Sequence, residues 1–400
     1  MLSYSIRELV IFMATRRGVD RRLGRLVDVE AFRSAARSHL PKIIFDHIEG
    51  GAGNETTVRA NESAFDEWTF RPRVLVDVSS RCTEIALFGD QLGMPVLLAP
   101  TGMAGFTSPH GEVAALRAAE AFGTRLVVST AASHSFEELG AVSHQRHWFQ
   151  LYPWGDRALM SELMARAMQG GLGVLCVTVD MPVTGIRRRD RRNSFSAPPR
   201  ITLQSAADIV GHPAWLAKYL WHRRYSMRNL TTSTSKAIPP ANQFASLFNP
   251  QMDWAELEWI RSRWAGPMLI KGLTHPADAE LALAVGVDGV IVSNHGGRQL
   301  DGVLASLSAL PMVAAQVNGR VPVLVDGGVR SGMDLAKALC LGASACLIGR
   351  PYLYGLAIAG QRGVEAVLRV LREELDSSLA LLGCARASDL NREFLGAVAR

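Results

Sequence analysis

Paired cysteines are missing from this sequence. Its five cysteines occur in 400 residues without a Cys-x-x-Cys pair. Because several of them lie within apolar runs, we expect buried free thiols in a reducing compartment rather than a disulfide framework. No metal site is expected. The five are Cys82, Cys176, Cys340, Cys346 and Cys384, and those in apolar runs are Cys176, Cys340 and Cys346.

Long apolar segments are also missing. No window holds 18 uncharged apolar residues, so no membrane-spanning helix is expected. The N-terminal apolar run is interrupted by Arg7 and Glu8, and no Ala-x-Ala site follows it, which argues against a secretory signal peptide. We expect residues 1–25 to form an arm outside the main fold and residues 26–400 to form one domain.

The charge balance is basic but modest. A net charge of +6 and a pI near 9.3 suit an anionic cofactor or substrate, a nucleic acid or an anionic membrane surface, without selecting one. Nucleic-acid binding is disfavoured, because no platform of aromatic and basic residues occurs outside the segment 197–250.

The sequence does contain eight short apolar runs, each ending in a small or polar residue. The runs are continuous rather than alternating, as expected of strands buried on both faces. Stretches of helical periodicity separate most of them, so the repeated units predict a closed TIM (β/α)8 barrel. A doubly wound open sheet is the alternative, but no Gly-x-Gly-x-x-Gly fingerprint follows the first run. The runs cover residues 95–100, 125–130, 148–152, 173–180, 267–272, 289–294, 321–328 and 345–350.

Polar side chains lie at or just past the C-terminal end of every run. In a barrel these ends form one rim, which is the face where barrel enzymes place their active sites. The sequence therefore predicts a reaction site built from Thr101, Ser129, Gln150, Tyr152, Thr178, Asp180, Lys271, Ser293, His295, Asp326 and Arg350.

One connection is far longer than a single helix requires. The insertion at about residues 197–250, between the fourth and fifth runs, joins Pro/Ser/Thr-rich loops to a short apolar and basic stretch. Such a mixture is typical of a helix that docks on a membrane surface, with an active-site lid or an oligomer contact as the alternative. The stretch contains Trp215, Leu216, Tyr219, Leu220 and Trp221 beside Lys218, Arg223, Arg224 and Arg228.

The last two runs end in glycine and arginine. Asp326, Gly327, Gly328 and Arg330 follow the seventh run, and Gly349 and Arg350 end the eighth. Glycines let a phosphate approach backbone N–H groups, and arginine offers bidentate hydrogen bonds. Together they predict a phosphate site for a nucleotide or a flavin.

Five further residues are candidates for the chemistry of this site. His295 is a candidate base with Asp180 as a possible partner, and Arg187 and Arg298 are placed to grip a carboxylate from two sides. Lys271, within an apolar run, is open to several interpretations: a partner of a reduced flavin, a lysine paired with a carboxylate, or a Schiff-base lysine.

Several motifs resemble those of the FMN-dependent α-hydroxy-acid dehydrogenase/oxidase family, from about Leu40 to residue 395. The motifs are SNHGGRQLDG, FQLY, TVDMPVTGIRRRD, LIKG and VDGGVRSG. The resemblance implies a TIM barrel, bound FMN and oxidation of an (S)-2-hydroxy acid to the 2-oxo acid. The resemblance also implies a homo-oligomer, namely a tetramer. The membrane-associated members of the family imply docking at the inner face of the cell membrane. They also imply that electrons pass to a quinone.

The resemblance also implies a role for each matching residue. His295 takes the proton with support from Asp180, Tyr152 bonds the substrate hydroxyl, and Lys271 stabilises the reduced flavin. Arg187 and Arg298 bind the carboxylate. The flavin ring and ribityl chain are expected to contact Pro100, Thr101, Gly102, Ser129, Gln150, Thr178 and Ser293, and the phosphate end to contact Asp326, Gly328, Arg330, Gly349 and Arg350.

The sequence departs from the family pattern at His47, which stands where the family usually has a carboxylate-binding tyrosine. We expect His47 to contact the substrate, and a neutral hydroxy lactone or ester is an alternative substrate. Gly102 resembles the dehydrogenases rather than the oxidases, and Ala131 leaves room for a larger side chain. A soluble oxidase that produces hydrogen peroxide and an FMN-dependent barrel isomerase are the alternative functions.

Overall fold

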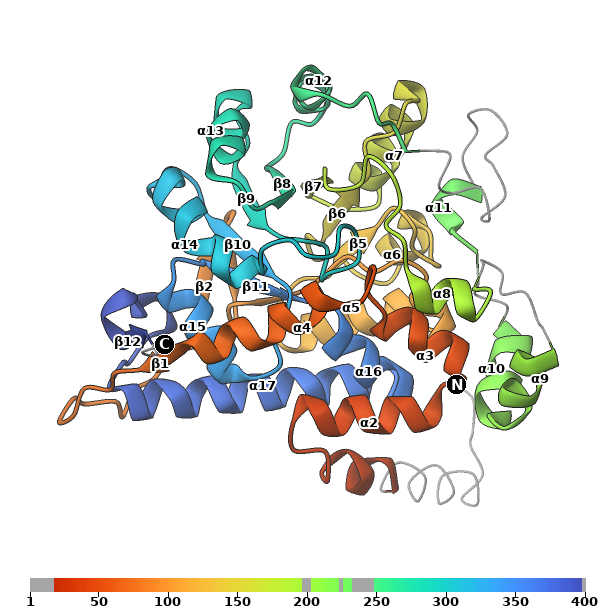
Figure 1. Cartoon of the computed structure of the whole chain (residues 1–400), viewed down its shortest axis with the longest axis horizontal. Helices are drawn as coiled ribbons and strands as arrows, with labels where there is room; N and C mark the ends of the chain where they lie inside the picture. The colour runs from red at the N-terminus through yellow and green to blue at the C-terminus, as the bar shows by residue number, and fades with distance from the viewer. Residues whose placement is uncertain (1–17, 196–202, 223–225, 232–247, 398–400) are drawn as a thin grey trace.

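The computed structural model describes residues 18–195, 203–222, 226–231 and 248–397. Eight parallel strands form one sheet in the order β4-β11-β10-β9-β8-β7-β6-β5. A parallel bridge between Leu98 and Leu126 joins its first and last members, so the sheet closes into a barrel (Figure 1). The predicted TIM barrel and its eight strands are confirmed. They are β4 (Val96–Leu98), β5 (Val127–Ser129), β6 (Trp148–Leu151), β7 (Val174–Thr178), β8 (Met268–Leu273), β9 (Gly289–Val292), β10 (Val323–Asp326) and β11 (Ala345–Ile348).

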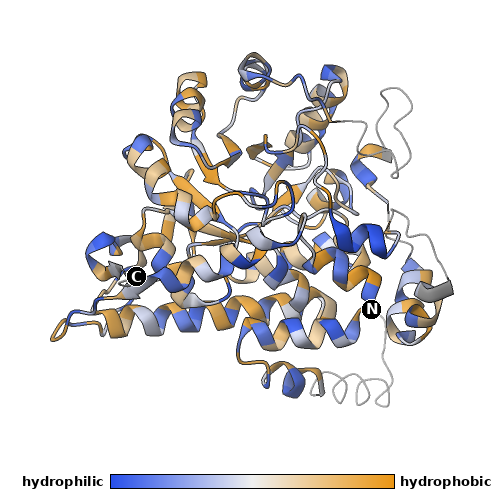
Figure 2. Ribbon diagram, in the orientation of Figure 1, coloured by the Kyte–Doolittle hydropathy of each residue, from blue (hydrophilic) through white to orange (hydrophobic). Residues whose placement is uncertain are grey.

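The strands are continuous in hydrophobicity because both of their faces are buried (Figure 2). Inward side chains such as Leu97, Ile291 and Leu324 form an interior cluster. The hairpin of β2 (Ile85–Leu87) and β3 (Asp90–Leu92) adds its apolar side chains to that cluster and closes the N-terminal end of the barrel. The candidate site lies at the opposite, C-terminal end of the barrel strands.

Helices cover the outside of the barrel. The helix α13 (Pro276–Val285) begins at a proline, where the missing N–H costs nothing, and is followed by Gly286, whose φ of 83° suits a left-handed cap. The connecting helices are α5 (Gly111–Ala121), α6 (Phe136–Gly140), α7 (Arg157–Gln169), α12 (Trp254–Arg263), α13 (Pro276–Val285), α14 (Ser306–Val317), α15 (Gly332–Cys340), α16 (Arg350–Ala359) and α17 (Gln361–Leu382).

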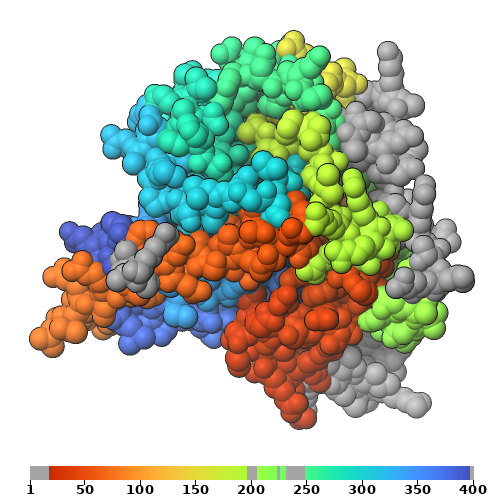
Figure 3. Space-filling view, viewed as in Figure 1, coloured from red at the N-terminus to blue at the C-terminus, as the bar shows by residue number. Residues whose placement is uncertain are grey.

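The N-terminal segments pack against the barrel. Within the predicted arm, Leu23 is buried and Asp20 pairs with Arg362; residues 1–17 lie outside the described part of the chain. The helices α2 (Val29–His39), α3 (Lys42–Glu49) and α4 (Thr56–Ser63) follow, and β1 (Trp68–Phe70) pairs with β12 (Leu395–Ala397) near the other terminus. In Figure 3 α4, the segment after β9 and the helix α8 (Arg188–Arg192) meet on one face, where Ala52 N donates to Gly297 O.

The long insertion contributes α9 (Leu203–Val210), α10 (Pro213–His222) and α11 (Arg228–Thr231), while 196–202, 223–225 and 232–247 lie outside the described residues. The predicted docking stretch covers most of α10 and includes Arg228 of α11, while its Arg223 and Arg224 lie outside the described residues. Trp215 does not belong to an exposed face: it is buried, and its indole N–H donates to the carbonyl of Phe106 at 2.8 Å. Leu220 and Trp221 are 61% and 85% exposed. None of the described helices is both long and apolar enough to cross a bilayer.

Buried thiols were predicted for three cysteines, and the structure confirms them. Cys176, Cys340 and Cys346 are buried and free, as is Cys384. Burial raises the pKa of Cys176 to about 12, which keeps this thiol protonated and unreactive.

Candidate active site

A cavity of about 430 Å³ opens at the C-terminal end of the barrel strands. Most of the predicted site residues line it. Ser129, Ser293 and Asp180 do not, but each bonds a residue that does: Gln150, Lys271 and His295 respectively. The predicted residues that line the cavity are His47, Pro100, Thr101, Gly102, Gln150, Tyr152, Thr178, Arg187, Lys271, His295, Arg298, Asp326, Gly328, Arg330, Gly349 and Arg350.

The loop after β9 holds His295 in an unusual backbone conformation. The φ of His295 is 59°, in the left-handed region that side chains other than glycine rarely adopt. Its neighbour Asn294 exchanges two hydrogen bonds with Asn61 of α4, at 2.9 and 2.8 Å, and Asn294 also accepts from Gly297 N. This buried amide pair fixes the loop before any substrate arrives, as a preorganised site requires.

His295 and Asp180 form an imidazole–carboxylate pair. Nδ1 of His295 lies 3.0 Å from Oδ1 of Asp180, which leaves Nε2 as the ring nitrogen available to the cavity. Burial lowers the pKa of His295, and Asp180 opposes that effect. Burial alone would raise the pKa of Asp180, but the charges of His295 and Lys271 lower it, so this carboxylate stays ionised. A neutral imidazole whose proton is held on Nδ1 can accept a proton at Nε2.

Lys271 is a buried, charged lysine. Its Nζ lies 2.7 Å from Oδ2 of Asp326 and 2.7 Å from Oγ of Ser293. Burial alone would lower the pKa of Lys271, but Asp326 and Asp180 raise it above the usual value. A Schiff-base lysine needs a neutral amine, so this interpretation is disfavoured. The other two interpretations are compatible with each other, because Lys271 pairs with Asp326 and also lines the cavity.

Tyr152 lies beside the imidazole, its ring 6.4 Å from that of His295 and nearly parallel to it. Burial, and then the charge of Asp180, raises the pKa of Tyr152 to about 12. The phenol therefore keeps its proton at physiological pH and can donate a hydrogen bond into the cavity.

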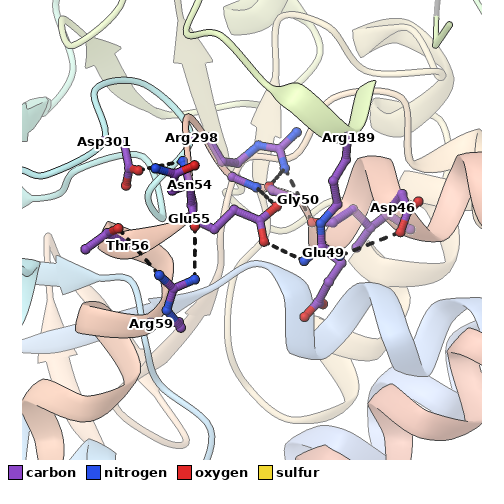
Figure 4. Close-up of polar contacts among 12 residues, drawn as sticks. Asp46, Glu49, Gly50, Asn54, Glu55, Thr56, Arg59, Arg189, Arg298 and Asp301 are labelled. Carbon is purple, nitrogen blue, oxygen red and sulfur yellow. Dashed lines mark hydrogen bonds and ion pairs between the residues drawn. The ribbon is translucent and has the colours of Figure 1, made fainter. Parts of the chain in front are cut away.

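Arginines crowd one side of the cavity. Arg298 donates to the carbonyls of His47 and Gly50 at 2.9 and 2.6 Å, as Figure 4 shows for Gly50. Burial, followed by the charges of Arg187 and Arg350, lowers the pKa of Arg298 well below the usual arginine value. Like charges this close, in a place shielded from water, are relieved by a bound anion.

Buried polar atoms on the cavity wall fit a flavin. Nε2 of Gln150, Oγ1 of Thr178 and Oδ1 of Asp326 are buried and have no partner within the described chain. They offer one amide donor, one hydroxyl and one carboxylate acceptor, which suit the carbonyls and ring nitrogen of an isoalloxazine and the hydroxyls of a ribityl chain.

The far end of the cavity suits a phosphate. Gly327 and Gly328 have φ of 92° and 88°, and an added Cβ at Gly328 would collide with the backbone of Asn61. The N-terminus of α16 begins at Gly349 without a side-chain cap. Its free N–H groups and the helix dipole favour an anion there. By contrast, Ser331 and Asp334 already cap α15.

The two predicted phosphate arginines already have partners. Arg330 pairs with Glu62 at 2.7 Å, and Arg350 donates to the carbonyls of Ile48, Glu49, Gly50 and Gly296. Both line the cavity, so their positive charge faces it, but their donors also tie α3 and α4 to the barrel.

Several residues of the site were not predicted from the sequence. Asp190 bonds His47, and Phe195 stacks on it, although neither was singled out. The side chains of Phe106, Met181 and Met227 add apolar surface to the lining of the cavity. Asp190 could have been predicted as a site residue from its position three residues after Arg187, because one turn of helix places the two side chains on the same face.

Gly102 and Ala131 lie against each other. A Cβ built at Gly102 would approach Cβ of Ala131 to 3.1 Å, and both residues line the cavity. Two small residues therefore lie side by side on the cavity wall.

Comparisons with known proteins show the family of this chain. A family model described as FMN-dependent dehydrogenase matches residues 36–397. The chain is 42% identical to an L-lactate dehydrogenase of Alcaligenes faecalis over 91% of this chain and 97% of that one. It is 40% identical to an L-lactate oxidase of Nostoc sp. strain PCC 7120, over 92% and 98% of the two chains.

Solved structures give the same result. The crystal structure of (S)-mandelate dehydrogenase, described as a monotopic membrane protein, superposes with a TM-score of 0.88. Its sequence is 36% identical, and the match covers 93% of this chain and 100% of that chain. The chain described here therefore belongs to the family of FMN-dependent dehydrogenases that oxidise 2-hydroxy acids, with FMN as its cofactor.

Proposed function

We propose that the protein oxidises an (S)-2-hydroxy acid whose carboxylate is bound by Arg187 and Arg298. The observation that carries this proposal is the meeting, on one cavity, of the His295–Asp180 pair and a crowded group of arginines. A base and a carboxylate clamp on the same wall are what the oxidation of a 2-hydroxy acid requires.

Each cavity residue has a place in the proposed reaction. FMN, when bound, would accept the two electrons of the oxidation and one of the two hydrogens that the substrate loses. Nε2 of His295 takes up a proton from the substrate, and Asp180 stabilises the resulting imidazolium through Nδ1. Tyr152 donates to the substrate oxygen, and the ammonium of Lys271 stabilises negative charge on the reduced cofactor.

The remaining predicted residues are proposed to hold FMN. The ring and ribityl chain would be bound by Pro100, Thr101, Gly102, Ser129, Gln150, Thr178 and Ser293. The phosphate end would be bound by Asp326, Gly328, Arg330, Gly349 and Arg350. The partnerless atoms of Gln150, Thr178 and Asp326 and the uncapped α16 support this assignment.

The test is flavin reduction without oxygen by matched pairs of substrates. Each 2-hydroxy acid is compared with its methyl ester, and a set of hydroxy lactones is included. We expect the acids to bleach the flavin at least about tenfold more efficiently, because charge-assisted hydrogen bonds to arginine are lost in neutral compounds. Lactones or esters that react as fast as the acids would exclude the carboxylate clamp.

We propose a quinone as the electron acceptor, supported by Gly102, which resembles the dehydrogenases of the family rather than the oxidases. The second candidate is a soluble oxidase that produces hydrogen peroxide, which the likeness to an L-lactate oxidase favours. Oxygen consumption by the purified protein with a good substrate separates the two. A homo-oligomer is a further proposal from the family resemblance.

A peripheral contact with the inner face of the cell membrane is proposed for α10. Its exposed Leu220 and Trp221 lie beside the exposed Lys218, and Val210 at the end of α9 is also exposed. Apolar side chains that enter the lipid and a cation that meets its headgroups are typical of such a contact.

The double variant Leu220→Ser/Trp221→Ser is expected to weaken binding to vesicles that contain anionic lipid by at least about tenfold. The variant loses two apolar side chains, and burial of each in the lipid contributes roughly 1 kcal/mol or more to the free energy of binding. Sedimentation with vesicles measures it. Leu381→Ser, at an exposed leucine of α17, is the matched control. Unchanged sedimentation of the double variant would rule out docking through α10.

A further inference from the structure

A second imidazole–carboxylate pair, His47 and Asp190, lines the cavity that His295 also lines. His47 of α3 has Nδ1 3.1 Å from Oδ2 of Asp190 in α8. Its ring stacks on Phe195 with centroids 3.8 Å apart and planes within 9°. Both pairs engage the carboxylate through Nδ1, so both leave Nε2 as the nitrogen available to the cavity.

Charged groups reach His47 from two other elements. Asp190 and Arg187 come from α8 and its N-cap, with Nη1 of Arg187 4.0 Å from Oδ2 of Asp190. Arg298, in the loop after β9, donates to the carbonyl of His47 itself. Burial lowers the pKa of His47; Asp190 opposes this, and Arg298 and Arg187 add to it. The ring is therefore neutral near neutral pH when no anion is bound.

We propose that His47, which stands where the family usually has a carboxylate-binding tyrosine, takes up one proton from solvent when the substrate carboxylate binds beside it. This inference rests on the proposed function. In the complex Nδ1–H donates to Asp190 and Nε2–H donates to the carboxylate, so an imidazolium lies between two anions. The substrate charge offsets the two arginines that disfavour protonation of the free ring. No other bond forms or breaks.

The proton uptake makes affinity depend on pH in a defined direction. The pKa of His47 is low in the free enzyme and higher in the complex, so between these two values the complex binds one more proton. Each unit rise in pH then weakens binding of the acid by up to about tenfold. A neutral analogue supplies no charge and shows no such dependence through His47.

Calorimetric binding to the oxidised holoenzyme tests the inference. The probe is 2-hydroxy-2-methylpropanoate, which has the hydroxyl and the carboxylate but no α-hydrogen and so is not oxidised. Its amide is the neutral control. Titrations in buffers of different ionisation heat give the number of protons taken up. Near neutral pH we expect the acid to take up close to one proton more in the natural protein than in His47→Tyr, whose phenol does not titrate there.

Further variants make the outcome decisive. His47→Gln is the second variant if the tyrosine is not accommodated, and Asp190→Asn is expected to lower proton uptake because the imidazolium loses its counter-charge. In kinetics, both His47 variants should flatten the pH dependence of KM for the acid. Equal uptake in the natural protein and both His47 variants would overturn the proton linkage alone. Failure of the acid to bind the natural protein at any pH would overturn the proposed function as well.

Discussion

His295→Gln is expected to slow flavin reduction by a 2-hydroxy acid about 10²–10⁴-fold while the protein still binds FMN, because general-base catalysis contributes about that much. In the natural protein Nδ1 of His295 lies 3.0 Å from Oδ1 of Asp180. Glutamine keeps a hydrogen-bonding side chain opposite this carboxylate, but it cannot act as a base. Stopped-flow bleaching of the bound flavin without oxygen measures the effect directly.

The matched control is His144→Gln. His144 is exposed in the loop before β6, at the end of the barrel opposite the cavity, and we expect this variant to reduce its flavin at the natural rate. A His295→Gln protein that keeps natural turnover would show that another group takes the proton. His47, the other imidazole on the wall, would be the first to examine.

Lys271→Met is expected to destabilise the protein by about 3–5 kcal/mol, because removing one partner of a buried ion pair leaves the other charge buried and unpaired. The remaining partner is Asp326, whose Oδ2 lies 2.7 Å from the ammonium and whose Oδ1 has no other partner among the described residues. The midpoint of unfolding in denaturant, with and without FMN, measures this loss.

Two variants check the cause of that loss. Lys218→Met removes an exposed lysine from α10 and should change stability by less than about 0.5 kcal/mol. Lys271→Met/Asp326→Asn should recover part of the stability, because the unpaired charge is gone. If the single and double variants are equally destabilised, the pair with Asp326 is not the source of the effect.

The barrel could be predicted because its physical cause is local. Strands buried on both faces must be apolar throughout, so the eight runs are visible in the sequence. The polar residues at their ends could be predicted for the same reason, since closure of the barrel brings those ends to one rim. His295, Asp180 and Lys271 were found in this way and lie together in the structure.

Contacts between distant segments could not be predicted. His47 and Asp190 are 143 residues apart, and Asn61 and Asn294 are 233 apart. Their pairing depends on how α3, α4 and α8 cross the mouth of the barrel, and no local pattern encodes that. Trp215 was assigned to a membrane-facing stretch by its composition, but its N–H donates to Phe106, which turns the indole inward.

The guanidinium of Arg350 is a further example. A phosphate site after the last strand was expected from composition, and the uncapped α16 agrees with it. That this arginine also bonds the backbone at the end of α3 depends on the packing of α3 over α16, which the sequence does not display.

Reduction of the bound flavin without oxygen is the decisive test of this function. The purified protein, loaded with FMN and freed of oxygen, is mixed with an (S)-2-hydroxy acid and no added acceptor. We expect that the visible absorbance of the oxidised flavin disappears and that one 2-oxo acid forms for each flavin. A protein that cannot hold FMN, or whose flavin stays oxidised with every 2-hydroxy acid offered, would contradict it.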